Sequence, residues 1–182
     1  PTAGPDSAYS PARCVGTHLS GNYTIRTNSR FESPYITIPE AAENPRLQFW
    51  HWFLFSVSDY GNLQIREQGT AQWTDIYGPF TSSSSDVWSN CIVDLSAYAG
   101  KTVQLGFNFH SADGGAGDNV SYGWYIDNIE LKTGPIEYSA FEDWEDGIKD
   151  WYASNGTWEL GIPTEIGRAS LGKECVSECR SR

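Results

Sequence analysis

The sequence lacks methionine and lacks any apolar run that approaches the roughly 20 residues needed to cross a bilayer. It also lacks the HExxH, GxSxG and GxxxxGK[ST] motifs, so the usual signatures of metallopeptidases, serine hydrolases and phosphate-binding loops are missing. The missing start methionine predicts a processed chain from a natural source, from which a signal peptide has been removed. We therefore expect no membrane insertion and no enzymatic activity.

Basic residues are scarce as well. The 12 Lys and Arg residues face 23 Asp and Glu residues, which gives a formal net charge of −11. Nucleic acids and anionic membrane surfaces are bound through basic patches, so neither partner is expected. An acidic chain is compatible with cation binding.

Cysteines and glycosylation motifs indicate an oxidising compartment. The four cysteines are even in number and lack zinc-type spacing, and four cysteines allow three disulfide pairings. They are Cys14, Cys91, Cys175 and Cys179. Asn-X-Ser/Thr motifs occur at Asn22, Asn119 and Asn155. These features predict a disulfide-bonded glycoprotein that is extracellular or located at the cell surface.

The apolar pattern predicts strands and no long helix. Leu47–Val57 is apolar on both faces, which is typical of a central strand covered on both sides. Val103–Phe109 alternates, Phe31–Ile38 is expected to form a strand, and Tyr122–Leu131 alternates around Asp127-Asn128. Short strands separated by turn residues predict an all-β antiparallel sandwich.

Several motifs resemble one family of secreted proteins. The segments Phe49-Trp-His-Trp52, Val93-Asp-Leu-Ser-Ala-Tyr-Ala-Gly100 and Gly123-Trp-Tyr-Ile-Asp-Asn-Ile-Glu-Leu131 follow the order found in MAM-like jelly-roll modules. Such modules are appended to secreted peptidases and adhesins, and the resemblance covers about residues 1–160. It implies a jelly-roll-like sandwich that is non-catalytic and serves adhesion, carbohydrate contact or assembly.

The motif order is out of phase with that family. Phe141–Gly147 and Gly156–Leu160 resemble the first strands of such a module, although they come last in this chain. The segment around Cys14 is also echoed around Cys175. We therefore predict a sandwich body at 1–135 and a C-terminal segment and tail at 136–182, which completes its own sandwich or that of a neighbouring copy.

Two functions follow from this order. The leading prediction is a secreted, non-catalytic structural subunit of an extracellular filament or surface polymer, which associates head to tail by donor-strand exchange of the C-terminal segment. The alternative is a carbohydrate- or cell-surface-binding module excised from a larger secreted enzyme or adhesin.

A calcium site is the first candidate site. The resemblance implies that the acids of the I-D-N and F-E motifs approach each other and hold Ca²⁺, which here selects Asp127, Glu142 and Asp143. The alternative is that Asp127 caps a turn and that Glu142 is solvated. Asp113 and Asp118, in a glycine-rich loop, form a weaker metal candidate, for which a plain solvated loop is the alternative.

Aromatic residues near turns form the second candidate site, a surface on which sugar rings stack. The candidates are Tyr60, Trp73, Tyr77 and Trp88. Most other tryptophans are expected in core or inter-sheet positions, namely Trp50, Trp52, Trp124 and Trp144. His51, inside a buried strand, is expected to be a hydrogen-bonded core histidine.

Overall fold

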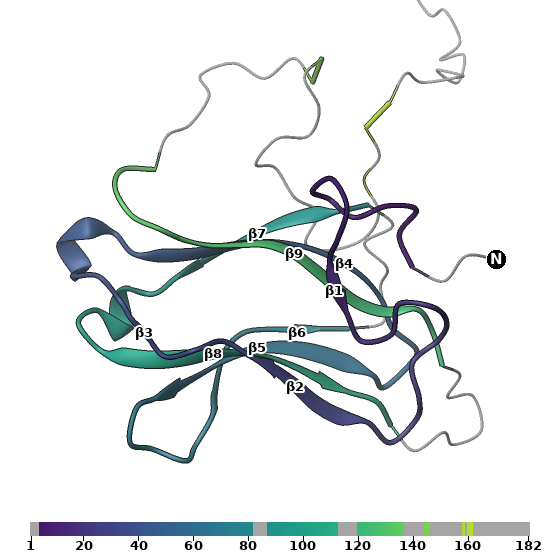
Figure 1. The fold of residues 1–182 in the computed structure, drawn as a ribbon, viewed down its shortest axis with the longest axis horizontal. Helices are drawn as coiled ribbons and strands as arrows, with labels where there is room; N and C mark the ends of the chain where they lie inside the picture. Colours follow the sequence, from purple (N-terminus) through teal and green to yellow (C-terminus); the bar gives the residue numbers. More distant parts are fainter. Residues whose placement is uncertain are drawn as a thin grey trace, which may run out of the picture.

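Two antiparallel β-sheets lie face to face in the computed structural model, which describes residues 4–81, 87–112, 120–136, 144–145, 158 and 160–161 (Figure 1). The strands are β1 (Val15–Gly16), β2 (Asn28–Glu32), β3 (Ile36–Thr37), β4 (Arg46–Leu54), β5 (Tyr60–Glu67), β6 (Thr74–Phe80), β7 (Ser89–Asp94), β8 (Thr102–His110) and β9 (Gly123–Lys132). Two 3-10 turns, η1 (Ala41–Glu43) and η2 (Ser96–Tyr98), are the described helices. None of the helices in these ranges is long and apolar enough to span a membrane.

The first sheet has the strand order β1-β9-β4-β7, and the second has the order β2-β8-β5-β6 with β3 also paired to β8. Every described strand pair is antiparallel. The prediction of an all-β antiparallel sandwich is therefore confirmed.

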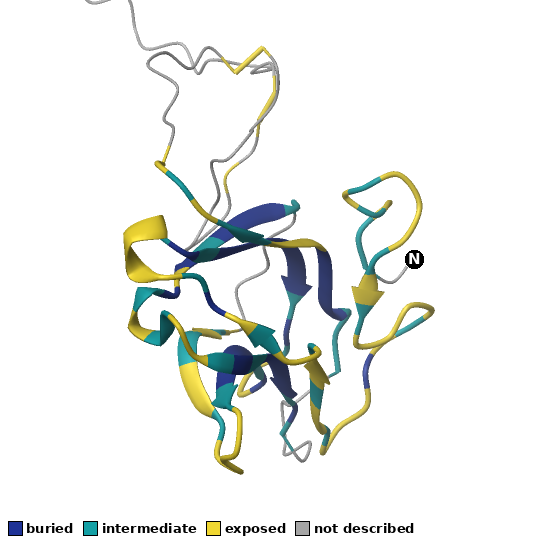
Figure 2. Cartoon of the chain, turned by 60° about the vertical axis from the view of Figure 1, so that its left-hand side comes forward, coloured by how far each residue is buried: buried dark blue, intermediate teal, exposed yellow. Residues whose placement is uncertain are grey.

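Strand β4 is buried on both faces, as its continuous apolar sequence predicts. Leu47, Phe49 and Phe53 point into the core between the sheets, whereas Trp50 and Trp52 alternate with them on the outer face of the first sheet. The two tryptophans are only 5% and 6% exposed. Figure 2 shows the buried positions concentrated on the strands of the two sheets. Trp50 and Trp52 are thus buried as expected, but outside the inter-sheet core.

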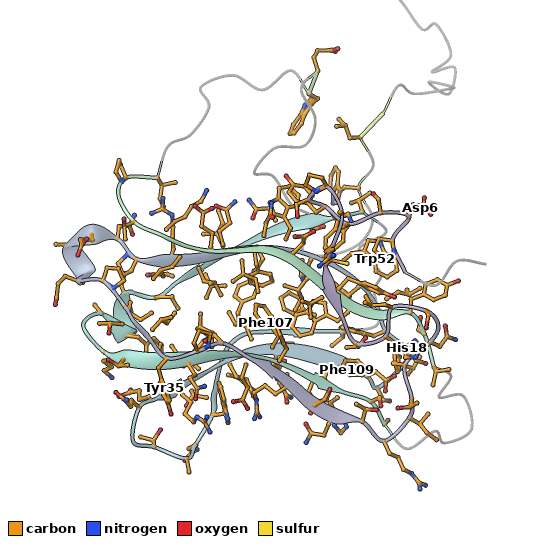
Figure 3. All side chains as sticks on the ribbon, in the orientation of Figure 1. Asp6, His18, Tyr35, Trp52, Phe107 and Phe109 are labelled. Carbon is orange, nitrogen blue, oxygen red and sulfur yellow. The ribbon has the colours of Figure 1, made fainter. Side chains whose placement is uncertain are left out.

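Aromatic side chains fill the space between the sheets. Trp124 of β9 is 2% exposed, and its ring centroid lies 5.7 Å from that of Phe107, which Figure 3 shows between the two sheets. His51 is also buried here, and its Nδ1 accepts a hydrogen bond of 3.3 Å from the Trp124 indole N–H. The expectation of a hydrogen-bonded core histidine is confirmed.

Two details of the strand pattern differ from the expectation. The continuous strand expected over Phe31–Ile38 is divided into β2 and β3, because Pro34 has no N–H to donate to the sheet. Strand β6 was not predicted from the apolar pattern of the sequence. Its burial alternates weakly because it lies at the edge of the second sheet and contains Gly78-Pro79.

Candidate functional site

Asp127 lies on the outer face of the first sheet, where residues 4–13, here called the N-terminal segment, pack against it. One carboxylate oxygen accepts the backbone N–H of Ser10 at 3.0 Å. The other accepts the Ser10 hydroxyl at 2.8 Å and the Asn128 N–H at 2.7 Å. Because Asp127 is only 8% exposed, these bonds satisfy an acid that burial would otherwise destabilise.

A β-bulge gives Asp127 this position. The pairing of β4 and β9 shifts between Gln48 and Trp50, so that β9 carries one extra residue opposite Phe49. Asn128 adopts φ of 45° there, a left-handed conformation that asparagine tolerates better than most residues. The polar pair that interrupts the alternation of this strand is therefore the site of the bulge.

The calcium prediction concerns residues that are mostly not described. Glu142, Asp143, Asp113 and Asp118 lie outside the described residues. Within the described ranges no group of three His, Cys, Asp or Glu side chains is placed to hold a metal ion. Asp127 alone remains of the predicted set, and its oxygens bond to Ser10 and Asn128. Calcium binding stays a prediction.

Aromatic rings gather beside Asp127 on the same face. The ring of Tyr9 stacks on Trp50 with centroids 3.8 Å apart and planes inclined by 13°. Trp88 lies 6.4 Å from Tyr9 and donates its indole N–H to the carbonyl of Ser7 at 2.9 Å. Tyr9 is 41% exposed and Trp88 is half-buried, so both rings reach the surface. We call this pair, with Trp50 beneath it, the Tyr9–Trp88 patch.

The other predicted stacking residues lie elsewhere. Tyr60 stacks on His110 with centroids 4.9 Å apart, and Tyr77 packs against the core. Trp73 lies on the outer face of the second sheet. The four candidates therefore do not share one surface, and sugar stacking at any of them stays a prediction.

Trp73 contacts two arginine side chains. The guanidinium carbons of Arg30 and Arg66 lie 4.4 and 4.6 Å from its ring centroid, distances typical of cation–π contacts. Gly106 leaves room for this arrangement, since a Cβ there would lie 2.8 Å from the Trp73 ring and 2.5 Å from Arg30. The guanidinium groups cover aromatic surface of Trp73 on which a sugar could otherwise stack.

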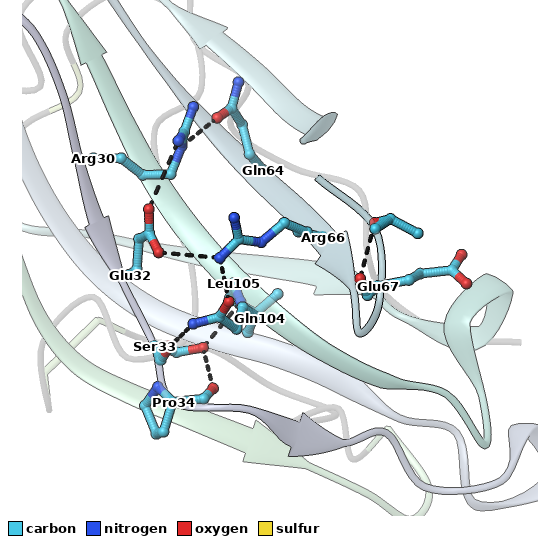
Figure 4. A network of polar contacts seen from close by, with 10 residues as sticks. Arg30, Glu32, Ser33, Pro34, Gln64, Arg66, Glu67, Gln104 and Leu105 are labelled. Carbon is cyan, nitrogen blue, oxygen red and sulfur yellow. Dashed lines mark hydrogen bonds and ion pairs between the residues drawn. The ribbon is translucent and has the colours of Figure 1, made fainter. Parts of the chain in front are cut away.

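A polar network surrounds the two arginines (Figure 4). Arg30 donates to Gln64 at 2.7 Å, Arg66 donates to Gln104, and Glu32 pairs with both arginines at 3.7 and 3.5 Å. These residues come from β2, β5 and β8, and sequence reasoning did not select them. Polar residues at alternate positions of these strands could have indicated that they share one face of a sheet. The sequence does not show how the strands pair, and this register is what brings the side chains into contact.

The two described cysteines are both free, and their thiols differ in how accessible they are to solvent. Cys14 is partly buried, and burial followed by the negative charge of Asp127 raises the pKa of its thiol. Cys91 is 1% exposed in the core, and burial raises its pKa to about 12. Cys175 and Cys179 lie outside the described residues, so disulfides that involve them stay predictions.

We expect Cys91 to resist thiol reagents in the folded protein. After gentle reduction, a maleimide should label Cys14 at least a hundredfold faster than Cys91, because the reagent can reach the partly buried thiol of Cys14 but not the thiol of Cys91, which is 1% exposed. Peptide mass spectrometry assigns each label, and unfolding in denaturant should make the two rates similar. Equal labelling rates in the native protein would contradict the buried position of Cys91.

Of the three glycosylation motifs, only that at Asn22 lies within the described residues, and Asn22 is exposed. Asn119 and Asn155 lie outside them. Glycosylation at all three stays a prediction.

Comparison with known proteins finds similarity to parts of bacterial peptidases, while no family model matches the sequence. Over 134 residues the chain is 35% identical to Bacillopeptidase F of Bacillus subtilis (strain 168). The matched region covers 72% of this chain and 9% of that protein. Over 107 residues the chain is 34% identical to the pre-pro-metalloprotease PrtV of Vibrio cholerae serotype O1 (strain M66-2). The matched region covers 54% of this chain and 11% of that protein. The chain thus spans about a tenth of the length of these curated relatives.

The two relatives help to decide between the predicted filament subunit and the predicted module of a larger protein. Both carry the name of a peptidase, and in both the similarity is confined to a small part of a much longer protein. This favours the module of a larger enzyme over the filament subunit. The more specific resemblance to MAM-like modules stays a resemblance.

Proposed function

We propose that the chain is a non-catalytic β-sandwich module of a larger extracellular peptidase and that it attaches this peptidase to a glycan surface. The observation that carries the proposal is the partial match to two peptidases, each of which is about ten times longer than the matched region. A sandwich with its own hydrophobic core is the kind of unit that folds inside a longer chain.

Three further features support the extracellular location. One relative is named as a pre-pro protein, a form made as a precursor. The chain carries three glycosylation motifs, and Asn22 is exposed. Its four cysteines are compatible with an oxidising compartment.

The Tyr9–Trp88 patch is the proposed contact surface. Aromatic rings present flat apolar faces, against which the C–H groups of a sugar ring can pack. Polar contacts hold the N-terminal segment in place beside the patch, because the Ser7 carbonyl accepts the indole N–H of Trp88 and the Ser10 hydroxyl donates to Asp127. The stacking of Tyr9 on Trp50 holds the Tyr9 ring in place at the surface.

The test is binding of the purified chain to a glycan array and to insoluble polysaccharides. We expect Trp88→Ala to weaken binding at least tenfold, since one aromatic–sugar contact would be lost. Tyr9→Ala should have a similar effect without disturbing the indole hydrogen bond to Ser7. Trp73→Ala, on the opposite sheet, is the matched control and should bind as the wild type does. Circular dichroism checks that each variant is folded.

Two results would overturn the proposed contact surface. One is the absence of binding to every glycan tested. The other is loss of binding in Trp73→Ala with full binding in Trp88→Ala and Tyr9→Ala, which would place the contact on the second sheet.

A further inference from the structure

The outer face of the second sheet carries polar side chains at alternate positions of its strands. In β5 and β8 the core residues alternate with residues that point away from the core. The outward positions include Asn62, Gln64 and Arg66 in β5 and Gln104 and Asn108 in β8. Arg30 and Glu32 of β2 join this surface, because both contact outward residues of β5. The polar surface lies on the side of the sandwich opposite to the Tyr9–Trp88 patch.

Two guanidinium groups share one close carboxylate on this surface. The guanidinium carbons of Arg30 and Arg66 lie 4.4 and 4.6 Å from the centroid of the Trp73 ring. Glu32 pairs with both arginines at 3.7 and 3.5 Å, which are long contacts for a charge-assisted hydrogen bond (Figure 4). Asp75 of β6 bonds instead to two side-chain amides. Among the described residues, two positive charges are therefore paired with one acid, in a chain whose net charge is −11.

Several N–H groups of this surface have no acceptor among the described residues. The Nε of Arg66 is buried without a hydrogen-bond partner. Arg30 donates from its Nε to Gln64, whereas its terminal nitrogens make no hydrogen bond to the described part of the chain. The side-chain amide of Asn108, the residue paired with Arg30 across the strands, also lacks a partner there, although Asn108 is only 8% exposed. Because nearly buried donors without acceptors are costly, an acceptor oxygen that reaches them is stabilised.

The two arginines are accessible and are held in position. The side chains of Arg30 and Arg66 are 25% and 23% exposed. Gly106 lies beneath them, and a Cβ there would come within 2.5 Å of Arg30 and 2.8 Å of Trp73. The glycine therefore allows the arginine and the ring to lie close to the sheet. Since Trp73 already orders both guanidinium groups, less side-chain entropy is lost when they bind a ligand.

The unpaired groups select a carboxylate as the ligand. All of them are N–H donors, and the fork of a guanidinium matches the two oxygens of a carboxylate. A second carboxylate would also balance the charge of the two arginines that share Glu32. Polypeptides carry carboxylates at the C terminus and on acidic side chains, and each cleavage by a peptidase produces a new C-terminal carboxylate.

We propose that Arg30, Arg66 and Asn108, with Trp73 beneath the arginines, form a binding site for a carboxylate of a polypeptide. We call these four residues the arginine–Trp73 site. The carboxylate follows from the donors, whereas the choice of a polypeptide rests on the proposed function, which assigns this chain to a peptidase. Because the site and the Tyr9–Trp88 patch lie on opposite sheets, a peptide and a glycan can be bound together. The module would then retain substrate or product peptides beside an attached enzyme.

Calorimetric titration of the full chain with short peptides tests the ligand. Acetyl-tetraalanine with a free C terminus carries one carboxylate, and so does an amidated peptide in which one alanine is replaced by glutamate. Amidated acetyl-tetraalanine carries none. We expect the two carboxylate peptides to bind and the third not to bind. The tighter of the two identifies the C terminus or the acidic side chain as the source of the carboxylate.

Variants of the chain test the site. Arg30→Gln and Arg66→Gln should each weaken binding of the carboxylate peptides by about tenfold, because each loses hydrogen bonds to a charged group. Arg26→Gln, at an exposed arginine in the turn before β2, removes the same charge and should bind as the wild type does. Trp73→Ala should weaken peptide binding and retain glycan binding, and Trp88→Ala should do the reverse. Circular dichroism checks that each variant is folded.

Nuclear magnetic resonance of the wild type locates the contact without a substitution. On titration with the tighter carboxylate peptide, the side-chain amide signals of Asn108 should shift, and the indole N–H signal of Trp88 should not. Three results would overturn the proposal: equal binding of the amidated peptide, no binding of either carboxylate peptide, or unchanged affinity in both Arg30→Gln and Arg66→Gln. These titrations contain no glycan, so their failure and a failure of the glycan assay are distinguishable.

Discussion

Acidification from pH 6.5 towards pH 3 should lower the free energy of unfolding by roughly 4 to 5 kcal/mol through His51 alone, at about 1.4 kcal/mol for each pH unit. Burial lowers the pKa of His51 to about 3 from its ordinary value of 6.5. The rings of Phe49, Phe53 and Phe80 surround the imidazole and offer no negative charge to stabilise its protonated form.

The direction of the effect follows from the depressed pKa. Above pH 6.5 the imidazole is neutral in both states, so His51 leaves stability unaffected. Between pH 6.5 and 3 the unfolded chain binds a proton that the folded chain does not, and stability falls as the pH falls. Below pH 3 both states bind the proton and the loss is complete.

Urea unfolding of wild type and His51→Gln across this pH range measures the contribution. Glutamine can accept the indole N–H of Trp124 but does not titrate, so His51→Gln should remove the contribution of His51 to the acid-dependent slope, about 1.4 kcal/mol for each pH unit. His18→Gln, at an exposed histidine, should retain the wild-type slope. The same slope in His51→Gln and wild type would show that His51 is not buried in its neutral form.

The substitution Trp124→Ala is expected to lower the free energy of unfolding by about 3–5 kcal/mol, the range for removing a buried large aromatic side chain. The indole contacts Phe80 and Phe107 and also donates to His51, so the substitution leaves a cavity and an imidazole without its donor. Gly61 lies against the same ring, because a Cβ there would come within 2.7 Å of it.

Denaturant unfolding with circular dichroism tests this second effect. Val57→Ala, at a residue that is 64% exposed, is the control and should change stability by less than about 0.5 kcal/mol. A loss below about 1 kcal/mol for Trp124→Ala would contradict the central place of this ring in the core.

The sequence predicts those features that depend on local pattern. The continuous apolar run around Phe49 predicts a strand covered on both faces, and β4 has that position. Asp127-Asn128 interrupts an alternating strand, and these residues lie at a bulge where backbone N–H groups and a serine satisfy the acid. The side-chain period of a strand is sufficient for β4. At Asp127-Asn128 the period marks only where the alternation is interrupted, because the bulge depends on the pairing with β4 and Ser10 lies 117 residues away in the sequence.

Features that join distant strands were not predictable in the same way. Arg30, Arg66 and Trp73 meet only because β2, β8 and β5 pair in one particular register. The packing of Tyr9 on Trp50 likewise depends on the return of the N-terminal segment over the first sheet. A shift of one residue would turn these side chains to the other face, and a single sequence does not fix that register.

The central claim is that this chain is one module of a larger extracellular peptidase. Its most direct test is capture of the native polypeptide from the culture medium of the source organism with an antibody against this chain, followed by mass spectrometry. We predict a secreted polypeptide several times larger than 20.2 kDa whose other peptides belong to a peptidase. A 20 kDa polypeptide, or a larger one without a peptidase domain, would contradict the account.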